Sequence, residues 1–142
     1  MTSFRRQTVD LLFSERCSCV IRNGDDLRIF RERGVKDLFG LLRDDPAFLR
    51  GAFVADKVVG KGAAALMILG GVDALFAGVV SRAALELLDR EGVHAEYRTV
   101  VPHIVDRAGT GICPVERACA DCTSAAECLP RIEAFLRRMS II

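Results

Sequence analysis

Short apolar runs separated by turn residues dominate the first part of the chain. Residues 18–22 and 27–31 flank Asn23-Gly24-Asp25-Asp26, and a turn of this composition between two such runs predicts a β-hairpin. Longer apolar runs follow it, each bounded by glycine, proline or charged residues. These longer runs predict further strands at residues 52–59, 73–80 and 94–101.

Helical spacing of apolar residues fills the intervals between the predicted strands. Ser3 is the expected cap of the first helix, while Ser81 and Gly92 are expected to begin and close a later one. Ser124-Ala-Ala-Glu127 has the capping-box pattern of the last helix, although Pro130 can move that start a turn later. The expected helices cover residues 3–15, 35–42, 61–69 and 82–91, a segment after Cys113, and the carboxyl terminus.

This order of elements predicts an α/β fold. After the hairpin, strands alternate with helices, which favours a mixed or mostly parallel sheet with helices on both faces. We therefore expect a three-layer αβα sandwich around a five-stranded mixed sheet. The 142 residues contain no repeat or linker and suffice for one core, so we expect a single domain over residues 1–142.

The junction between the strand at 52–59 and the following helix is the first candidate site. Asp56, Lys57 and Lys61 are the only charged residues in an otherwise apolar stretch that breaks at Gly60. Helix N-termini at such junctions bind anions, so Lys61 is a candidate ligand for a phosphate or carboxylate, and a candidate base if its pKa is lowered. The eight-residue phosphate-loop pattern does not match here. In the alternative interpretation, Lys61 extends to solvent and the glycines at 60 and 62 allow close packing.

Cys113 is the second candidate. Pro114 and Glu116 follow it as the first and third residues of an expected helix, which makes Cys113 the N-cap. A thiol at that position lies at the positive end of the helix and favours the thiolate, and Arg107 is expected to add to this field. Alternatively, Glu116 closes the cap and Cys113 is a passive small residue.

Cysteines are concentrated near the carboxyl terminus, where four follow the spacing C-x5-C-x2-C-x5-C. Four thiolates can hold zinc or an iron–sulfur cluster, but the paired C-x2-C motifs of common zinc sites are missing. Buried cysteines also pack as small apolar residues, so core packing and redox pairing are alternatives. The four candidate metal ligands are Cys113, Cys119, Cys122 and Cys128.

Charge and hydropathy exclude several classes of partner. Lysine and arginine number 20 against 19 aspartates and glutamates, so no net field draws the protein to nucleic acid or to anionic membranes. The amino terminus lacks the apolar core of a signal peptide, and Gly70-Gly71 and Asp73 interrupt the apolar residues 62–80. We expect a cytoplasmic protein whose cysteines are thiols or metal ligands. His103 is a candidate acid or base in the loop before Cys113.

Two segments carry a resemblance to a known family. Residues 56–64, which begin Asp56-Lys57, and residues 106–116, which contain Cys113-Pro114, resemble the uncharacterised prokaryotic family called domain of unknown function 1893. The resemblance implies a cytidine-deaminase-like fold. Zinc-dependent deamination is not expected, because the His-x-Glu motif of zinc deaminases is missing and Lys61 with its glycines stands where Pro-Cys-x-x-Cys would be. Departures from the family pattern are Gly62, Asp106, Val115, Cys119, Cys122 and Cys128.

Three interpretations of function remain open. The first is a small-molecule-binding domain for an anionic or nucleotide-like metabolite; if a reaction occurs, Cys113 is the expected nucleophile and Lys61 the base or charge stabiliser. The second is a metal-binding or redox protein that uses the clustered cysteines. The third is a homo-oligomeric interaction module. The residues assigned to the binding pocket are Asp56, Lys57, Lys61, Arg107, Cys113 and Glu116.

Overall fold

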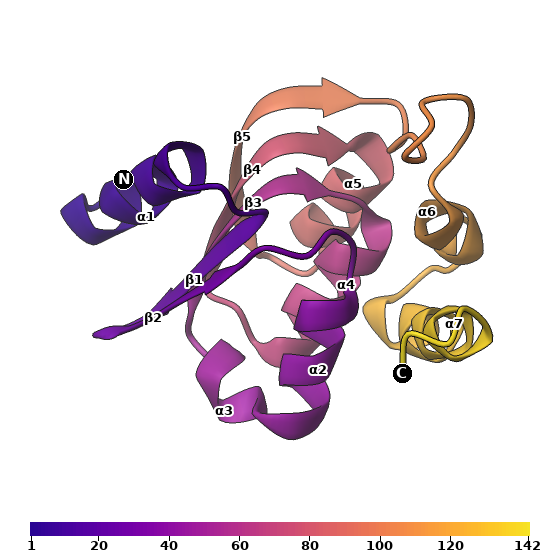
Figure 1. Ribbon diagram of the computed structural model, residues 1–142, viewed down its shortest axis with the longest axis horizontal. Coiled ribbons are helices and arrows are strands. Elements are labelled where there is room, and N and C mark those ends of the chain that lie inside the picture. Colours follow the sequence, from indigo (N-terminus) through magenta and orange to yellow (C-terminus); the bar gives the residue numbers. More distant parts are fainter.

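A computed structural model describes all residues, 1–142, as one mixed sheet with helices on both faces (Figure 1). The five strands stand in the order β2-β1-β3-β4-β5. β1 pairs antiparallel with both β2 and β3, whereas β3, β4 and β5 run parallel. The predicted mixed α/β sheet is thus confirmed. The strands are β1 (Cys19–Asn23), β2 (Asp26–Phe30), β3 (Phe53–Val59), β4 (Ala74–Ser81) and β5 (His94–Val101).

Seven helices accompany the sheet, including one that the sequence pattern did not predict. That helix begins at Pro46, buries Phe48 and Leu49, and is too short to show helical periodicity. The first helix is capped by the Thr2 side chain, which accepts from the Arg5 amide, and not by Ser3. The helices are α1 (Ser3–Ser14), α2 (Lys36–Asp44), α3 (Pro46–Leu49), α4 (Lys61–Gly70), α5 (Arg82–Arg90), α6 (Pro114–Cys119) and α7 (Ala125–Arg138).

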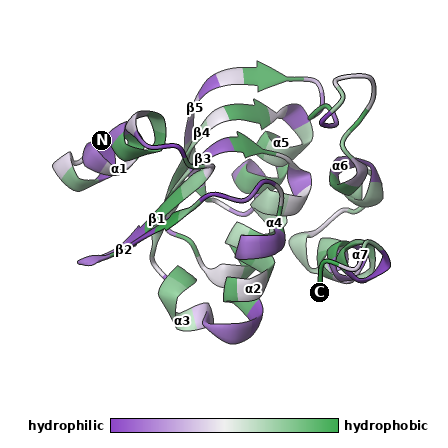
Figure 2. Ribbon diagram, in the orientation of Figure 1, coloured by the Kyte–Doolittle hydropathy of each residue, from purple (hydrophilic) through white to green (hydrophobic).

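The two faces of the sheet are covered unequally, as Figures 1 and 2 show. α1 alone packs on one face, over a small apolar cluster that includes Leu12, Phe53 and Phe76. The opposite face carries the larger core beneath α2, α4 and α5, with α6 and α7 packed against α4. The chain is therefore layered as helix, sheet and helices, with most of its apolar contacts on the α4 side.

α4 lies almost entirely inside the protein. Its residues from Lys61 to Met67 are all buried, because α5 and α7 cover the sides that the sheet leaves free. Small residues make this possible: a Cβ added at Gly62 would lie 2.5 Å from Val115 Cγ1. The expected close packing at the glycines of this segment is confirmed, and it brings α6 directly onto the start of α4.

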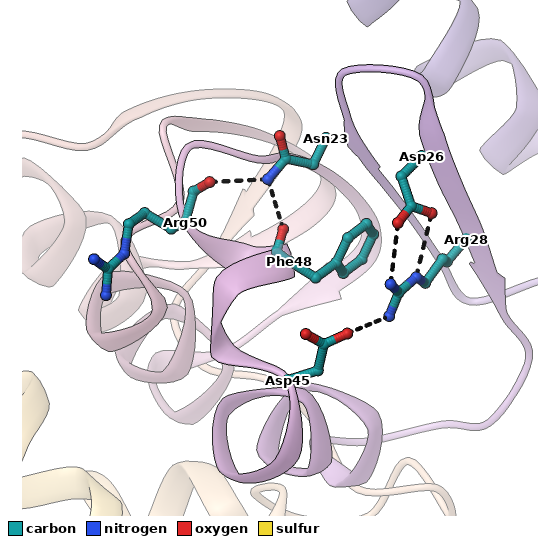
Figure 3. A network of polar contacts seen from close by, with 6 residues as sticks. All are labelled: Asn23, Asp26, Arg28, Asp45, Phe48 and Arg50. Atoms are coloured by element: carbon teal, nitrogen blue, oxygen red, sulfur yellow. Dashed lines mark hydrogen bonds and ion pairs between the residues drawn. The ribbon is translucent and has the colours of Figure 1, made fainter.

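The hairpin β1–β2 is fastened to the rest of the protein by a polar network (Figure 3). The Asn23 amide donates to the carbonyl oxygens of Phe48 and Arg50, both at 2.9 Å. Arg28 pairs with Asp26 and Asp45, and its guanidinium carbon lies 3.7 Å from the centre of the Phe48 ring. These contacts hold the edge of the sheet against α3.

Pro130 lies inside α7 and does not delay its start. The helix begins directly after Ser124, whose hydroxyl oxygen accepts from the Glu127 amide at 3.2 Å. Glu127 in turn accepts from the Thr123 amide, so the cap reaches one residue further back than a standard capping box. The later start that Pro130 suggested is therefore wrong; the carbonyl that its missing N–H would engage belongs to the exposed Ala126.

None of the helices has the length and apolar character needed to cross a bilayer.

Candidate functional site

The N-termini of two helices lie side by side at the carboxyl ends of β3 and β4, because these strands are parallel neighbours. Gly60 follows β3 directly and caps α4, and Ser81 ends β4 and caps α5 with its hydroxyl oxygen, which accepts from the Ala84 amide. The segment after β5, residues 102–113, passes over the same ends of the strands and leads into α6. In proteins with parallel sheets, ligands bind at the carboxyl ends of the strands.

The Glu116 carboxylate lies between these elements and binds three of them. One oxygen, Oε1, accepts from the Lys61 amide at 2.9 Å and from the Ser81 hydroxyl at 3.0 Å. The other, Oε2, accepts from the Ile104 amide at 2.6 Å. The side chain of Glu116 is only 6% exposed. It does not close the cap of its own helix, which corrects that alternative.

This arrangement satisfies a group that is costly to bury. A carboxylate in the interior needs hydrogen-bond donors, and each bond to a charged group contributes about 1.5–3 kcal/mol. Two of the three donors stand at the start of helices, where the aligned backbone amides favour negative charge. Glu116 thus occupies the place where the sequence led us to expect an anionic ligand.

Lys61 is engaged at both ends, and its side chain does not extend to solvent. It is 5% exposed, and its ammonium donates to the carbonyl oxygens of Ala120 and Cys122, at 3.3 and 2.5 Å. These carbonyls belong to the turn between α6 and α7. The alternative in which Lys61 extends to solvent is wrong, because α6 and α7 cover it. Its ammonium forms no ion pair with the Glu116 carboxylate and is bonded instead to the α6–α7 turn.

Asp56 lies further along β3, apart from the Glu116 carboxylate. It stands four residues before Gly60, a distance of about 13 Å along a strand. Burial raises the pKa of Asp56 to about 7, partly offset by hydrogen bonds from the Val58 and Lys57 amides. Burial also raises the pKa of the Cys19 thiol, which pairs with Asp56 in the sheet register. No hydrogen bond or ion pair joins Asp56 or the half-buried Lys57 to Glu116.

Cys113 borders the Glu116 carboxylate through Ile104. The Cys113 amide donates to the Ile104 carbonyl at 2.8 Å, on the residue whose own amide binds Glu116. Cys113 is the N-cap of α6, as predicted, but its thiol makes no capping hydrogen bond. Arg107 and His103 are exposed and form no ion pair. The structure thus brings Lys61, Glu116 and Cys113 together, and leaves Asp56 and Arg107 apart.

Three of the clustered cysteines meet between α6 and α7. The Cys128 thiol lies near those of Cys119 and Cys122, and the three side chains influence one another's pKa values. The neighbouring Cys128 thiol, helped by the Lys61 and Arg131 charges, lowers the pKa of Cys119. The pKa values of Cys122 and Cys128 are raised, that of Cys122 mainly by burial. Cys113 lies a full length of α6 away, about 9 Å along the helix.

As placed, no group of three or more histidine, cysteine, aspartate or glutamate side chains has an arrangement that could hold a metal ion. All six cysteines are free thiols. Zinc or an iron–sulfur cluster bound by the four predicted ligands therefore stays a prediction, and would require movement of Cys113 toward the other three.

Two surface hollows lie away from Glu116. One of about 530 Å³ is bordered by α2 and by the carboxyl-terminal Ile141 and Ile142. Another of about 220 Å³ lies between the amino terminus and the start of β5. Neither is lined by Lys61, Cys113 or Glu116.

A comparison with family models matches residues 7–136 to the family described as "Domain of unknown function (DUF1893)". The chain belongs to this family. A solved structure of a DUF1893 family protein (TM1506) from Thermotoga maritima is similar to it, with a TM-score of 0.86. The alignment covers 94% of this chain and 91% of that one at 23% identity, so it shows the fold alone. No curated protein matches the chain.

Within this DUF1893 protein, Ser81 and Ile104 are the site residues that the sequence reasoning missed. Ser81 was recognised only as a helix cap, although its position after β4 matches that of Gly60 after β3. That shared position is the signal that could have added Ser81 to the site. Ile104 contributes through its backbone amide, for which its side chain gives no signal.

Proposed function

We propose that this protein binds a small anionic molecule at the N-terminal ends of α4 and α5, and that the ligand's carboxylate or phosphate replaces the Glu116 carboxylate there. The observation that carries this proposal is the convergence of the Lys61 amide, the Ser81 hydroxyl and the Ile104 amide on one pair of oxygens. A carboxylate or phosphate offers the same acceptors.

The carboxylate is one of the contacts that bind residues 102–113 and α6 to the remainder; others are the packing of Val115 beside Gly62 and the hydrogen bonds from Lys61 to the α6–α7 turn. Residues 102–113 are braced internally by the bridge between Val105 and Ile112 and by the hydrogen bond from the Thr110 amide to Asp106. Because Glu116 follows this segment on α6, outward movement of the two together would free all three donors. Cys113 and the exposed Arg107 would then border the ligand.

The proposed ligand is nucleotide-like, in keeping with a cytidine-deaminase-like fold, which we likewise propose. In this arrangement Lys61 contributes its backbone amide, while its ammonium keeps the α6–α7 turn in place. If the bound molecule reacts, Cys113 is the thiol nucleophile that borders it, since its amide is bonded to Ile104.

Removal of Glu116 tests the donor set directly. Glu116→Ala leaves the three donors facing a space of carboxylate size, so acetate should restore part of the lost stability. We expect sodium acetate to raise the Tm of Glu116→Ala well above its Tm in sodium chloride of equal ionic strength. The matched control, Glu133→Ala, removes an exposed glutamate from α7 and should show no such difference. An equal acetate effect in both variants would contradict the proposal.

A second experiment uses the protein with Glu116 in place. Inorganic phosphate, AMP and CMP are titrated calorimetrically into the wild type and into Ser81→Ala. Loss of the Ser81 hydroxyl should weaken binding about tenfold, the effect of one hydrogen bond to a charged group. If none of the three probes binds the wild type at millimolar concentration, the proposal fails for phosphate-containing ligands, whatever the acetate result.

A thiol redox function is the second candidate, supported by the burial of Cys119 and Cys128 in one cluster and by the influence of Cys128, which lowers the pKa of Cys119. A peroxide would oxidise the two thiols to a disulfide: one S–S bond forms, the O–O bond breaks, and water and an alcohol, or two waters, leave. Metal analysis and visible spectra after anaerobic purification test the alternative of zinc or an iron–sulfur cluster. Near-stoichiometric metal that is lost in a Cys119→Ser/Cys122→Ser variant would favour the metal site over the disulfide.

A further inference from the structure

β5 is an edge strand of the sheet, and the outer side of its backbone pairs with no other strand. It runs for eight residues, from His94 to Val101, and its backbone pairs only with β4 (Figure 1). A long edge strand presents unpaired N–H and C=O groups, which proteins normally protect with proline, lysine, bulges or a short strand. β5 contains no proline or lysine, and the first proline follows it at Pro102. The opposite edge, β2, has only five residues.

The side chains of β5 divide between the two faces in a defined way. Glu96 pairs in register with Phe76, which belongs to the cluster beneath α1, so Glu96 and Arg98 lie on the α1 face. The Arg98 guanidinium carbon is 3.8 Å from the centre of the Phe13 ring. Tyr97 lies on the other face and is 46% exposed.

This pattern is self-complementary when two copies of β5 pair antiparallel. A two-fold axis through Tyr97 sets Glu96 of each copy opposite Arg98 of the other, and Tyr97 opposite itself. Directly opposed residues in an antiparallel pair share a face and lie within contact distance, so two pairs of opposite charge form on the α1 face.

Neighbouring registers that also keep α1 of both copies on the same side of the joined sheet do not pair these opposite charges. A two-fold axis through Glu96 sets the two Glu96 carboxylates opposite each other, and an axis through Arg98 does the same with the two guanidinium groups. Like charges directly opposed destabilise a strand pair. Among the registers that place α1 of both copies on the same side of the joined sheet, the charges on β5 therefore favour the one with its axis at Tyr97.

We propose that this protein forms a homodimer through β5, with two copies paired antiparallel about a two-fold axis at Tyr97 so that their sheets join into one. Such a contact is isologous and closes on itself, and it removes the exposed edge. It uses no residue of the Glu116 site, so it stands or fails independently of the proposed ligand.

Charge reversal tests both the interface and its register. Sedimentation velocity of the wild type should show a dimer, and Glu96→Arg and Arg98→Glu should each weaken it by about tenfold or more in dissociation constant. The double variant Glu96→Arg/Arg98→Glu restores opposite charges and should recover most of the affinity. The matched control Glu91→Arg reverses an exposed charge outside the strand and should change nothing.

Cross-linking provides a second test that does not depend on Arg98, whose contact with Phe13 supports the fold. Tyr97→Cys places two thiols opposite each other at a separation that a disulfide spans, so mild oxidation should yield a covalent dimer. Glu91→Cys and the wild type give the background from other cysteines. A wild type that remains monomeric at every concentration overturns the proposal, and so does a dimer that neither reversal weakens or that cross-links equally in the control.

Discussion

The Glu116 carboxylate binds the backbone amide of Lys61, the first residue of α4, across 55 positions of sequence. The same residue, Lys61, holds the α6–α7 turn through its ammonium. One buried acid and one buried base therefore connect the sheet to the carboxyl-terminal helices without forming an ion pair with each other. The variants below separate these two connections.

Glu116→Gln should lower the free energy of unfolding by about 1–3 kcal/mol. The amide keeps one acceptor oxygen but turns an NH₂ group toward donors that need an acceptor, so at least one of them loses its partner. Urea unfolding at pH 7 measures the effect. Glu133→Gln, in an exposed pair with Arg137, is the control and should change stability by less than about 1 kcal/mol. Equal effects in the two variants would show that the buried contacts of Glu116 add nothing to the free energy of unfolding.

Lys61→Met should destabilise the protein by about 2–3 kcal/mol, because the carbonyls of Ala120 and Cys122 lose their buried donor. The loss should be local: amide exchange should accelerate in the α6–α7 turn more than in the sheet. Lys36→Met removes an exposed ion pair with Glu32 and serves as the control. If exchange in the turn is unchanged, the ammonium does not hold it.

Asp56 should make the protein less stable as the pH rises from about 4 to 7. Its pKa is raised from 3.8 to about 7 in the folded state, so over this window the folded chain binds more protons than the unfolded chain. Stability is fully present below the unfolded pKa and falls through the folded one, by up to about 4 kcal/mol. Asp56→Asn should lose this dependence and become relatively more stable at pH 8. Urea unfolding at pH 5 and pH 8 measures the difference, and parallel profiles for the two proteins would contradict it.

Gly62→Ala should destabilise the protein by about 1–3 kcal/mol, although alanine favours helix, because the new Cβ meets Val115 Cγ1 at 2.5 Å. Gly40→Ala in α2 is the matched control, since nothing lies within 4 Å of its added Cβ. That control should stabilise by about 0.5–1 kcal/mol. Thermal unfolding of both variants measures the pair, and a stable Gly62→Ala protein would show that Val115 moves aside freely.

The sequence was sufficient to predict the sheet and its helices because their signals are local. The apolar run at 52–59, the break at Gly60 and the cap at Ser81 each act within a few residues, and the structure has them within a residue or two of the expected bounds. The prediction failed at Pro130. The hydrogen bond that this proline removes lies on an exposed turn of α7, so the cap at Ser124 sets the start of the helix.

The contacts of the site were not predictable to the same degree because they join distant segments. Glu116 fits a local cap pattern, and only the approach of α6 to α4 gives it nearer and stronger donors. The burial of Lys61 follows from its apolar neighbours, but the carbonyls that it reaches belong to a turn nearly sixty residues away. Asp56 and Arg107 were grouped with them on charge and on nearness in sequence, which do not determine where a side chain lies in the fold.

The burial of α4 beneath α7 has a consequence for synthesis of the chain. Residues 61–70 leave the ribosome long before residues 125–138, which cover them last. Until then the side of α4 that α7 will cover, rich in alanine, leucine and methionine, remains exposed, and apolar surface of this kind promotes aggregation. A ribosome stalled before α7 would therefore hold a chain in which one apolar side of α4 has nothing to cover it.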